Sequence, residues 1–362
     1  MLPFTYITTV EQLKAAAIEW KNLDELALDL ECENNLHHYG TYITLIQLST
    51  GTKHWIVDVL LVGDISPLLD VFRSPRVLKV LHDISFDVRI LNSQFHCQLE
   101  PFFDTQLACF FLGKDQCGLG SLLENYFGIH KDSHFQRVDW TRRPLREDML
   151  SYAITDAAHL LELKKRLIQE LKQKGRLEWL GEECHHLAKQ ELVYEEQEYD
   201  DISGVKRLPP MNKAVARVLF EERRRLAQKT DKPQFMIFSN SILLELAQNP
   251  QTSLVFWKSV KGVNPAVHHD AEIFVSRVKL ALSECDQNSA CVKTVRLALT
   301  EDQKHQIEGI TQRRNALALN LAMKPHLLIS TDDIREAVIS HSLDHIRHWQ
   351  RELLRKEKVV EF

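Results

Sequence analysis

The chain has 362 residues, of which 44% are hydrophobic and 26% charged, and its formal net charge is −5. This length predicts two or three domains, and the composition excludes a largely disordered chain. Because the net charge is negative, nucleic acid could be bound only through a local basic surface and not through the charge of the whole molecule.

The sequence also indicates where the protein resides. It contains no run of about 18 apolar residues, and residues 1–6 include no basic segment followed by an apolar run. We therefore expect neither a membrane span nor export. The 7 cysteines are scattered and form no Cys-x-x-Cys pair, which argues against a zinc module or a disulfide framework. A reducing, cytoplasmic location follows as an expectation.

Residues 1–175 have the pattern of an α/β domain. A capping box within 8–12 predicts a short helix. Short apolar runs bounded by turn-forming residues then predict strands at 25–29, 43–48, 54–59 and 77–81. After residue 104 the apolar residues recur with helical spacing, over 107–112, 119–127 and 149–167.

The C-terminal half has a helical pattern that repeats itself. Residues 176–205 are acidic and predict a helix that ends in a linker, and a basic segment follows. Lys232-Pro233 pairs with Lys324-Pro325, and a polar cap cluster and an isoleucine follow each pair at a constant offset. The repeat predicts two copies of one small helical module. They would occupy 206–284 and 291–362, with a joint at 284–290.

Four acidic residues and one tyrosine form the most informative pattern. Asp29 and Glu31 stand at positions i and i+2 of a predicted strand, so their carboxylates leave the same face. Tyr152 and Asp156 stand at i and i+4 of a predicted helix and share a face. Asp87 opens the helix that follows the strand at 77–81. Like charges placed together in this way are unfavourable unless cations neutralise them.

Such a set of oxygen ligands, without Cys or His, selects Mg²⁺ or Mn²⁺ over zinc. Two ions about 4 Å apart stabilise the attacking and leaving oxygens of a phosphoryl displacement. In this hypothesis Asp29 bridges both ions, and Glu31 and Asp156 complete the site of the nucleophilic water. Asp87 acts through the second ion and its water shell, and Tyr152 orients the nucleophilic water by a hydrogen bond.

These residues carry a resemblance to the ribonuclease D family, in the tyrosine subclass of the DEDD superfamily of 3′–5′ exonucleases. Asp29-x-Glu31 matches the first motif, Phe86-Asp87 the second and Tyr152-x-x-x-Asp156 the third. The repeated C-terminal modules resemble, more loosely, the paired HRDC domains of that family. The resemblance implies an RNase H-like exonuclease domain followed by two small helical HRDC-like domains. It also implies hydrolysis from RNA 3′ ends that releases nucleoside 5′-monophosphates, and work on tRNA 3′ trailers.

The chain departs from the family pattern at three positions. Leu30 replaces a threonine between the first two acids, and Met149 stands where a glutamine is common. Ser133 falls where a lysine is expected upstream of the Asp139-Trp140 pair. These departures concern substrate contacts and leave the acidic residues intact.

Further residues are candidates for substrate contacts or for structural roles. Trp140 is a candidate to stack on a base, or a core tryptophan. Arg142 and Arg143 are candidates for phosphate contacts, because they lie just before the helix of Tyr152. The run of Arg223, Arg224 and Arg225 is either a clamp on the RNA backbone or a solvated face paired with Glu221 and Glu222. We interpret Asp83 and Asp104 as helix caps and not as further metal ligands.

The leading hypothesis is a metal-dependent 3′–5′ exoribonuclease that acts on RNA, with tRNA precursors as its substrates and no membrane partner. One alternative is a 3′–5′ DNA exonuclease on the same fold, since the catalytic motifs act on phosphate and discrimination depends on the 2′-OH. A second alternative is a catalytically silent scaffold that binds nucleic acid or protein. The sequence does not indicate an oligomeric state.

Overall fold

The computed structural model describes residues 2–285 and 299–361, so most of the predicted joint and the first residues of the predicted second module lie outside it. The chain divides into two compact units. The first comprises Met1–Glu31, Ile43–Tyr194 and Leu297–Phe362, and the second comprises Cys32–Tyr42 and Glu195–Arg296. Each unit is built around its own core.

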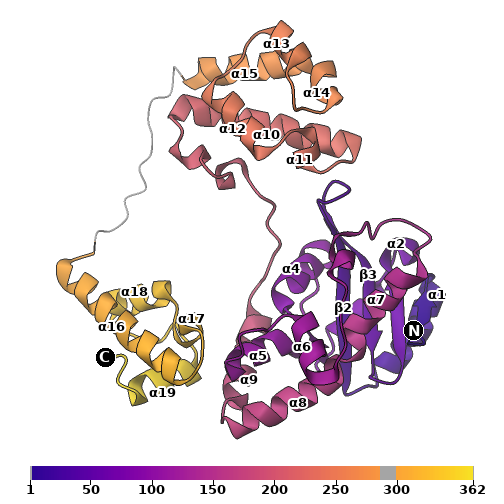
Figure 1. The fold of residues 1–362 in the computed structure, drawn as a ribbon, viewed down its shortest axis with the longest axis vertical. Helices are drawn as coiled ribbons and strands as arrows, with labels where there is room; N and C mark the ends of the chain where they lie inside the picture. Colours follow the sequence, from indigo (N-terminus) through magenta and orange to yellow (C-terminus); the bar gives the residue numbers. More distant parts are fainter. Residues whose placement is uncertain (1, 286–298, 362) are drawn as a thin grey trace. The chain divides into compact units, whose positions relative to one another are not determined.

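The first unit contains a six-stranded mixed sheet, in the order β1-β4-β3-β2-β5-β6 (Figure 1). The four strands predicted from apolar runs are present, as β2 (Glu25–Asn34), β3 (Thr41–Ser49), β4 (His54–Asp58) and β5 (Leu78–Leu81). The edge strands β1 (Thr5–Ile7) and β6 (Phe102–Asp104) were not predicted. Each has three residues, which is too short for an alternating pattern to be recognised.

Helices cover both faces of this sheet. Trp55 on β4 contacts Trp20 of α1 (Val10–Trp20), with ring centroids 5.5 Å apart. Its neighbour Ile56 belongs to a cluster with Ile154 of α7 (Glu147–Ala158). Because successive residues of a strand point to opposite faces, α1 and α7 lie on opposite sides of the sheet. In the central strand β2 the apolar run Leu26, Ala27 and Leu28 is fully buried, as expected for a strand whose sheet is covered on both faces.

The helical pattern at 149–167 belongs to two helices and not to one. Helix α7 ends at Ala158, and α8 (Leu160–Gln173) begins after a single residue, His159. The apolar spacing runs across this break, so the sequence pattern did not reveal it. The remaining elements of the first 194 residues are α2 (Val59–Val62), α3 (Ser66–Phe72), α4 (Ile84–Phe95), α5 (Thr105–Leu112), α6 (Leu119–Phe127), the 3-10 helix η1 (Ser133–Arg137) and α9 (Leu177–Lys189).

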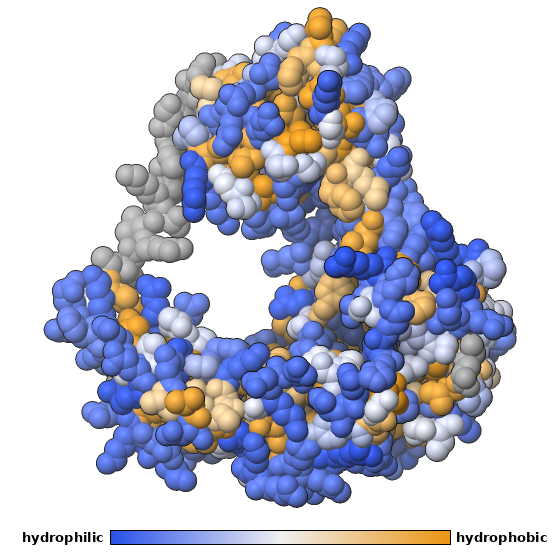
Figure 2. Space-filling view, in the orientation of Figure 1, coloured by the Kyte–Doolittle hydropathy of each residue, from blue (hydrophilic) through white to orange (hydrophobic). Residues whose placement is uncertain are grey.

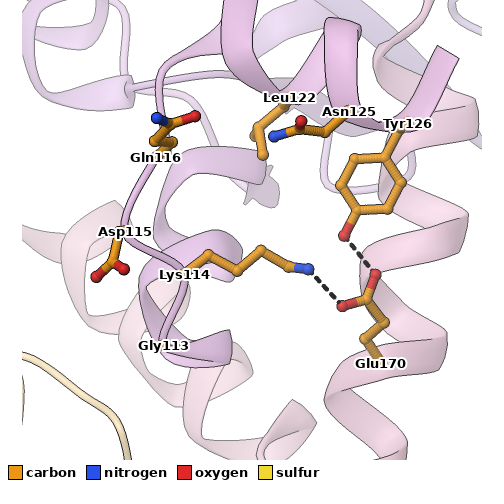
Figure 3. Close-up of a pocket in the computed structure, with 8 residues that line it drawn as sticks. All are labelled: Gly113, Lys114, Asp115, Gln116, Leu122, Asn125, Tyr126 and Glu170. Atoms are coloured by element: carbon orange, nitrogen blue, oxygen red, sulfur yellow. Dashed lines mark hydrogen bonds and ion pairs between the residues drawn. The ribbon is translucent and has the colours of Figure 1, made fainter. Parts of the chain in front are cut away.

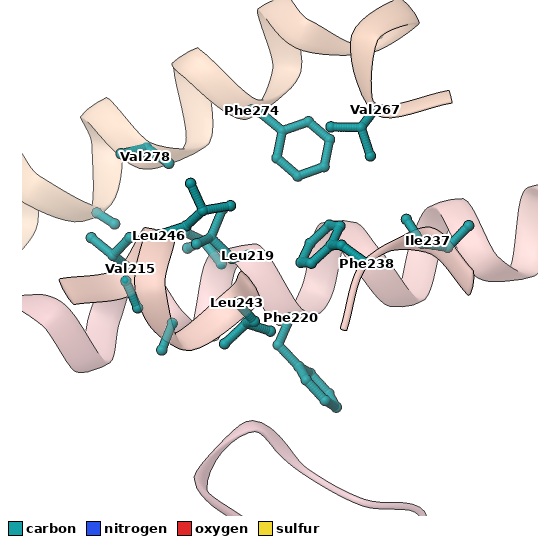
Figure 4. Close-up of a cluster of buried hydrophobic side chains, with 14 of the residues drawn as sticks. Val215, Leu219, Phe220, Ile237, Phe238, Leu243, Leu246, Val267, Phe274 and Val278 are labelled. Atoms are coloured by element: carbon teal, nitrogen blue, oxygen red, sulfur yellow. The ribbon is translucent and has the colours of Figure 1, made fainter. Parts of the chain in front are cut away.

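The second unit is helical and has a separate hydrophobic core (Figure 4). The long helix α10 (Pro210–Thr230) contributes Leu219 and Phe220 to it, and α15 (Ala271–Cys285) contributes Phe274. The other elements of this unit are η2 (Tyr199–Asp201), η3 (Val205–Arg207), α11 (Gln234–Ile237), α12 (Asn240–Gln248), α13 (Leu254–Ser259) and α14 (Pro265–His269).

A second helical module contains α16 (Glu301–Asn320), α17 (Pro325–Leu328), α18 (Thr331–Ser340) and α19 (His348–Lys356), and it shares local features with the first. Ser239 caps α12 as Ser330 caps α18. The buried Arg223 of α10 donates to the Phe238 carbonyl, and Arg314 of α16 donates to the Ile329 carbonyl. These matching caps and carbonyl contacts define a structural alignment of the two modules. In that alignment the two Lys-Pro sequences are offset from each other by one residue.

The second helical module packs on the exonuclease part of the first unit. Arg347 forms a bidentate ion pair with Glu183 of α9, at 2.6 and 2.9 Å. Trp349 of α19 stacks on Trp179 of α9, with ring centroids 5.0 Å apart. These aromatic and charged contacts attach the module through α9, the helix that precedes the predicted linker.

Two findings concern the membrane and the cysteines. Among the described residues, no helix is long and apolar enough to cross a membrane, and hydrophilic residues cover most of the visible face (Figure 2). Contrary to the expectation of no disulfide, Cys109 and Cys117 are bonded to each other. They flank the turn between α5 and α6, and the fold brings them together through Gly113, whose φ of 74° is readily adopted only by glycine.

A substitution at Arg143 tests how much its ion pair contributes to the stability of this part of the fold. Its guanidinium donates to the fully buried carboxylate of Asp58, at 2.5 and 2.8 Å. Arg143→Met would leave a buried carboxylate without its cation, so we expect a loss of about 3–5 kcal/mol in the free energy of unfolding. Denaturant titration measures this change.

The matched control is Arg142→Met. The Arg142 side chain is 81% exposed in its ion pair with Asp139, so this variant should change stability by less than about 1 kcal/mol. Equal effects of the two substitutions would contradict the structural role of Arg143.

Candidate active site

Three of the predicted acidic residues meet at one place. Asp29 and Glu31 lie on β2, and Asp156 lies on α7. One carboxylate oxygen from each lies within 4.8 Å of the others, close enough to share a cation. The strand pattern places Asp29 and Glu31 on one face, and the packing of α7 on that face brings in Asp156 from more than 120 residues away.

Asp87 lies next to this group but outside it. It occupies the first turn of α4, which follows β5, the neighbour of β2 in the sheet. Burial and the charge of Asp29 raise the pKa of Asp87 well above its ordinary value. The fold therefore brings the four predicted acids into one electrostatic neighbourhood, with three of them in direct reach of a common ion.

The acids are costly to ionise together. Burial, followed by the charge of Asp156, raises the pKa of Asp29 to about 8. Burial and the charge of Asp29 raise the pKa of Glu31 well above its ordinary value, and burial raises the pKa of Asp156 to about 6. Each shift has the sign expected for carboxylates that are withdrawn from water and repel one another.

These residues open onto a pocket of about 420 Å³, which we call the acidic pocket. The pocket is lined by acids of β2 and α7, by Tyr152, by the N-terminal residues of α6 and by the segment before and within η1. Its lining residues include Asp29, Glu31, Gly118, Ser121, Lys131, Ser133, Gln136, Tyr152 and Asp156. The acidic group is therefore accessible to a substrate.

Tyr152 is held by aromatic neighbours on its ring. Phe135 of η1 stacks on it with centroids 4.9 Å apart, and Trp140 lies beside it at 6.2 Å. Burial, followed by the charge of Asp156, raises the pKa of Tyr152 to about 12, so its hydroxyl keeps its proton at neutral pH. Trp140 is only 3% exposed. It supports Tyr152 from the core and is not placed to stack on a base.

Asp104 and Asp83 behave differently from each other. Asp104 caps α5 by accepting from the backbone N–H groups of Gln106 and Leu107, as predicted. Its carboxylate also accepts from the N–H groups of Asp83 and Ile84. Asp83 itself makes no side-chain cap to α4, so the expected cap is supplied by Asp104. Through this contact Asp104 fixes the start of the helix that carries Asp87.

The predicted arginine contacts to nucleic acid are mostly occupied by protein. Arg143 is paired with the buried Asp58, so the guanidinium is not free for phosphate. Arg142 is exposed and remains a candidate. In α10, Arg223 is buried and bonded to the Phe238 carbonyl and Asn240, while Arg224 pairs with Glu198 and Arg225 with Glu222 and Asp270. These contacts within its own module favour the second of the two interpretations, a face paired with acidic residues, over a clamp on the RNA backbone.

Lys131 is the residue of the site that sequence reasoning missed. Its ammonium pairs with Oδ1 of Asp156 and lies over the ring of Tyr152, 4.7 Å from the centroid. The signal was present, since a lysine was expected at position 133 and Ser133 stands there instead. Lys131, two residues earlier, also lines the acidic pocket.

A second pocket, of about 560 Å³, lies between α6 and α8 (Figure 3). In it the Lys114 ammonium donates to Glu170 at 2.8 Å, and the Tyr126 hydroxyl donates to the same carboxylate. Lys114 also lies over the Tyr126 ring, 5.2 Å from its centroid. This group therefore repeats the lysine, tyrosine and carboxylate combination away from the acidic cluster.

The residues present fit divalent cations. Hard carboxylate oxygens converge from two elements, and Lys131 only partly offsets their mutual repulsion. Among the described residues, no Cys or His joins this group. The fold and the chemistry together imply the use of a divalent metal.

Comparisons with known proteins agree with this geometry. Residues 4–172 match the 3′–5′ exonuclease family, and residues 212–270 match the HRDC domain. Ribonuclease D of Serratia proteamaculans is 28% identical over 76% of this chain and 74% of its own length. Ribonuclease D of Pseudomonas paraeruginosa is 28% identical over 92% of this chain and 91% of its own.

The crystal structure of Escherichia coli RNase D has the same fold. It aligns with a TM-score of 0.75 at 23% identity and covers 98% of this chain and 97% of its own. The α/β core, the acidic cluster and both domain matches lead to one conclusion. The chain carries a DEDD-type 3′–5′ exonuclease domain followed by an HRDC region, and it is a ribonuclease D-like exoribonuclease.

Proposed function

We propose that Asp29, Glu31, Asp87 and Asp156 hold two Mg²⁺ or Mn²⁺ ions and that Tyr152 positions the attacking water. The observation that carries this proposal is the convergence of three carboxylates within 4.8 Å at the wall of an open pocket. Buried acids with raised pKa values need neighbouring cations to be ionised at neutral pH.

When bound, the ions supply a water of lowered pKa and neutralise charge that develops on the phosphate. The chain's own residues hold the reactants. Asp29 and Glu31 are fixed by the central strand, and Asp156 by α7, so their oxygens have little freedom to move. Attack by the water oxygen on phosphorus breaks the bond to the 3′ oxygen of the preceding nucleotide, and the terminal residue leaves as a nucleoside 5′-monophosphate.

Tyr152 acts in this proposal through a hydrogen bond and not as a base. Its pKa of about 12 keeps the hydroxyl protonated, and the stacked ring of Phe135 limits its rotation. A fixed, neutral hydroxyl can hold the water along the line of attack. Trp140 and Phe135 are positioning residues for this hydroxyl.

We further propose that the substrates are RNA 3′ ends and include tRNA precursors. Escherichia coli RNase D, which shares the fold, is an exoribonuclease involved in structured RNA processing, and an HRDC domain follows the exonuclease domain here. Discrimination against DNA would depend on contacts to the 2′-OH within the acidic pocket. Exposed Arg142, beside the aromatic support of Tyr152, is the candidate among the predicted arginines for contact with the RNA backbone.

A comparison of matched substrates tests the proposed function. A 5′-labelled RNA, a DNA of the same sequence and a tRNA precursor are incubated with the protein and Mg²⁺, and the products are resolved nucleotide by nucleotide. We expect stepwise shortening of the RNAs from the 3′ end, loss of activity with EDTA and slower shortening of DNA. Asp156→Asn should reduce the rate by more than about a hundredfold, because a direct metal ligand is lost.

The matched control for that variant is Asp115→Asn, at an exposed acid outside the acidic pocket, which should keep normal activity. Equal rates on RNA and DNA would reject the RNA preference. The absence of nucleotide release from wild type at any Mg²⁺ or Mn²⁺ concentration would reject the catalytic proposal.

The repulsion among the acids predicts an unusual dependence of stability on pH. Because the folded-state pKa of Asp29 is raised to about 8, the folded state holds a proton that the unfolded state loses near pH 4. The free energy of unfolding of the metal-free protein should therefore fall as pH rises from about 4 to about 8. Thermal unfolding in EDTA across this range measures the effect.

Asp29→Asn removes the loss of stability that accompanies ionisation of the Asp29 carboxyl. In EDTA at pH 8 it should be more stable than wild type, by on the order of 2 kcal/mol, and at pH 4 the two should be similar. Saturating Mg²⁺ should stabilise wild type and leave the variant little changed. An Asp29→Asn protein that is less stable than wild type at pH 8 in EDTA would show that the carboxylate is not destabilising.

A further inference from the structure

Lys131 is the one lysine or arginine among the described residues that line the acidic pocket. Its side chain is 12% exposed, and its ammonium contacts Oδ1 of Asp156. It stands in the segment between α6 and η1, so neither a helix nor a strand accounts for its position. A lysine directed into a pocket with so little exposure is held there by the acids that it faces.

The Lys131 ammonium makes two contacts, one with an acid and one with the tyrosine ring. One is the ion pair with Asp156, and the other is the approach to the Tyr152 ring at 4.7 Å. The charge also reaches Asp29 and Glu31, since Lys131 opposes the rise of both pKa values. Lys131 is thus a monovalent cation placed where the carboxylates would otherwise repel one another.

We propose that Lys131 pairs with Asp156 in the metal-free protein and competes with divalent cations for it, and that its ammonium contacts a phosphate oxygen of the RNA once they bind. This inference rests on the proposed function of the same acids. An ammonium has three donors and a flexible stem, so it can leave one carboxylate oxygen for another anion while it stays beside Tyr152. The exchange moves no covalent bond.

Competition of this kind predicts that removal of the ammonium changes divalent-ion affinity and catalytic rate in opposite directions. Removing the ammonium takes a positive charge away from the site, so divalent ions should bind more tightly. The same change removes a cation from the scissile phosphate, so catalysis should be slower. A residue with a purely structural role would, when removed, loosen the site and weaken both.

The experiment compares Lys131→Met with wild type, using the full chain. Calorimetric titration with Mn²⁺ in the absence of RNA should show about tenfold tighter binding in the variant. The kcat for a 5′-labelled RNA at saturating Mn²⁺ should fall about a hundredfold. Lys131→Arg, which keeps the charge, should restore the wild-type Mn²⁺ affinity and part of the kcat.

Lys114→Met is the matched control, because Lys114 also pairs with a carboxylate and lies over a tyrosine ring, but outside the acidic pocket (Figure 3). It should change neither Mn²⁺ affinity nor kcat. If Lys131→Met does not fold, Lys131→Gln, which is also neutral, takes its place in both assays.

Unchanged or weaker Mn²⁺ binding in the neutral variants would overturn the inference, whatever happens to kcat. Tighter binding with an unchanged kcat would also overturn it, since the contact with phosphate would be absent. A wild-type protein that binds Mn²⁺ but degrades no RNA would reject the proposed function and leave the competition for Asp156 measurable by calorimetry.

Discussion

Repulsion among buried carboxylates governs the organisation of the site. Asp29, Glu31 and Asp156 are held so close that they could share one ion, and their pKa values are raised by burial and, for Asp29 and Glu31, by neighbouring acids. A fold optimised only for stability would not keep such a group. The central strand β2 and the packed helix α7 hold these side chains together.

Surrounding residues fix the position of each member of this group. The sheet fixes Asp29 and Glu31, and the cap from Asp104 fixes the start of the helix that carries Asp87. The stacked rings of Phe135 and Trp140 fix Tyr152. Lys131 then supplies a positive charge that belongs to the protein itself. Rigid ligands supported by a further layer of contacts are what metal-assisted hydrolysis requires, and the ammonium on its flexible stem is the part of the site that can adapt.

The sequence predicted the parts of this arrangement that follow from local periodicity. The strand spacing placed Asp29 beside Glu31, and the helical spacing placed Tyr152 on the face of Asp156. It did not predict Lys131, because no period governs the segment between α6 and η1. The sequence left two interpretations of the α10 arginines open for a similar reason. A run of arginines looks solvated in sequence, but Arg223 is buried and bonded to the Phe238 carbonyl, a contact that only tertiary packing reveals.

Anomalous diffraction from crystals of the protein grown with Mn²⁺ would decide whether these carboxylates hold two ions. We expect two anomalous peaks about 4 Å apart, one of them ligated by Asp29, Glu31 and Asp156, with the Lys131 ammonium no longer in contact with Asp156. Peaks located away from these carboxylates, or full Mn²⁺ occupancy with the Lys131–Asp156 ion pair intact, would contradict this expectation.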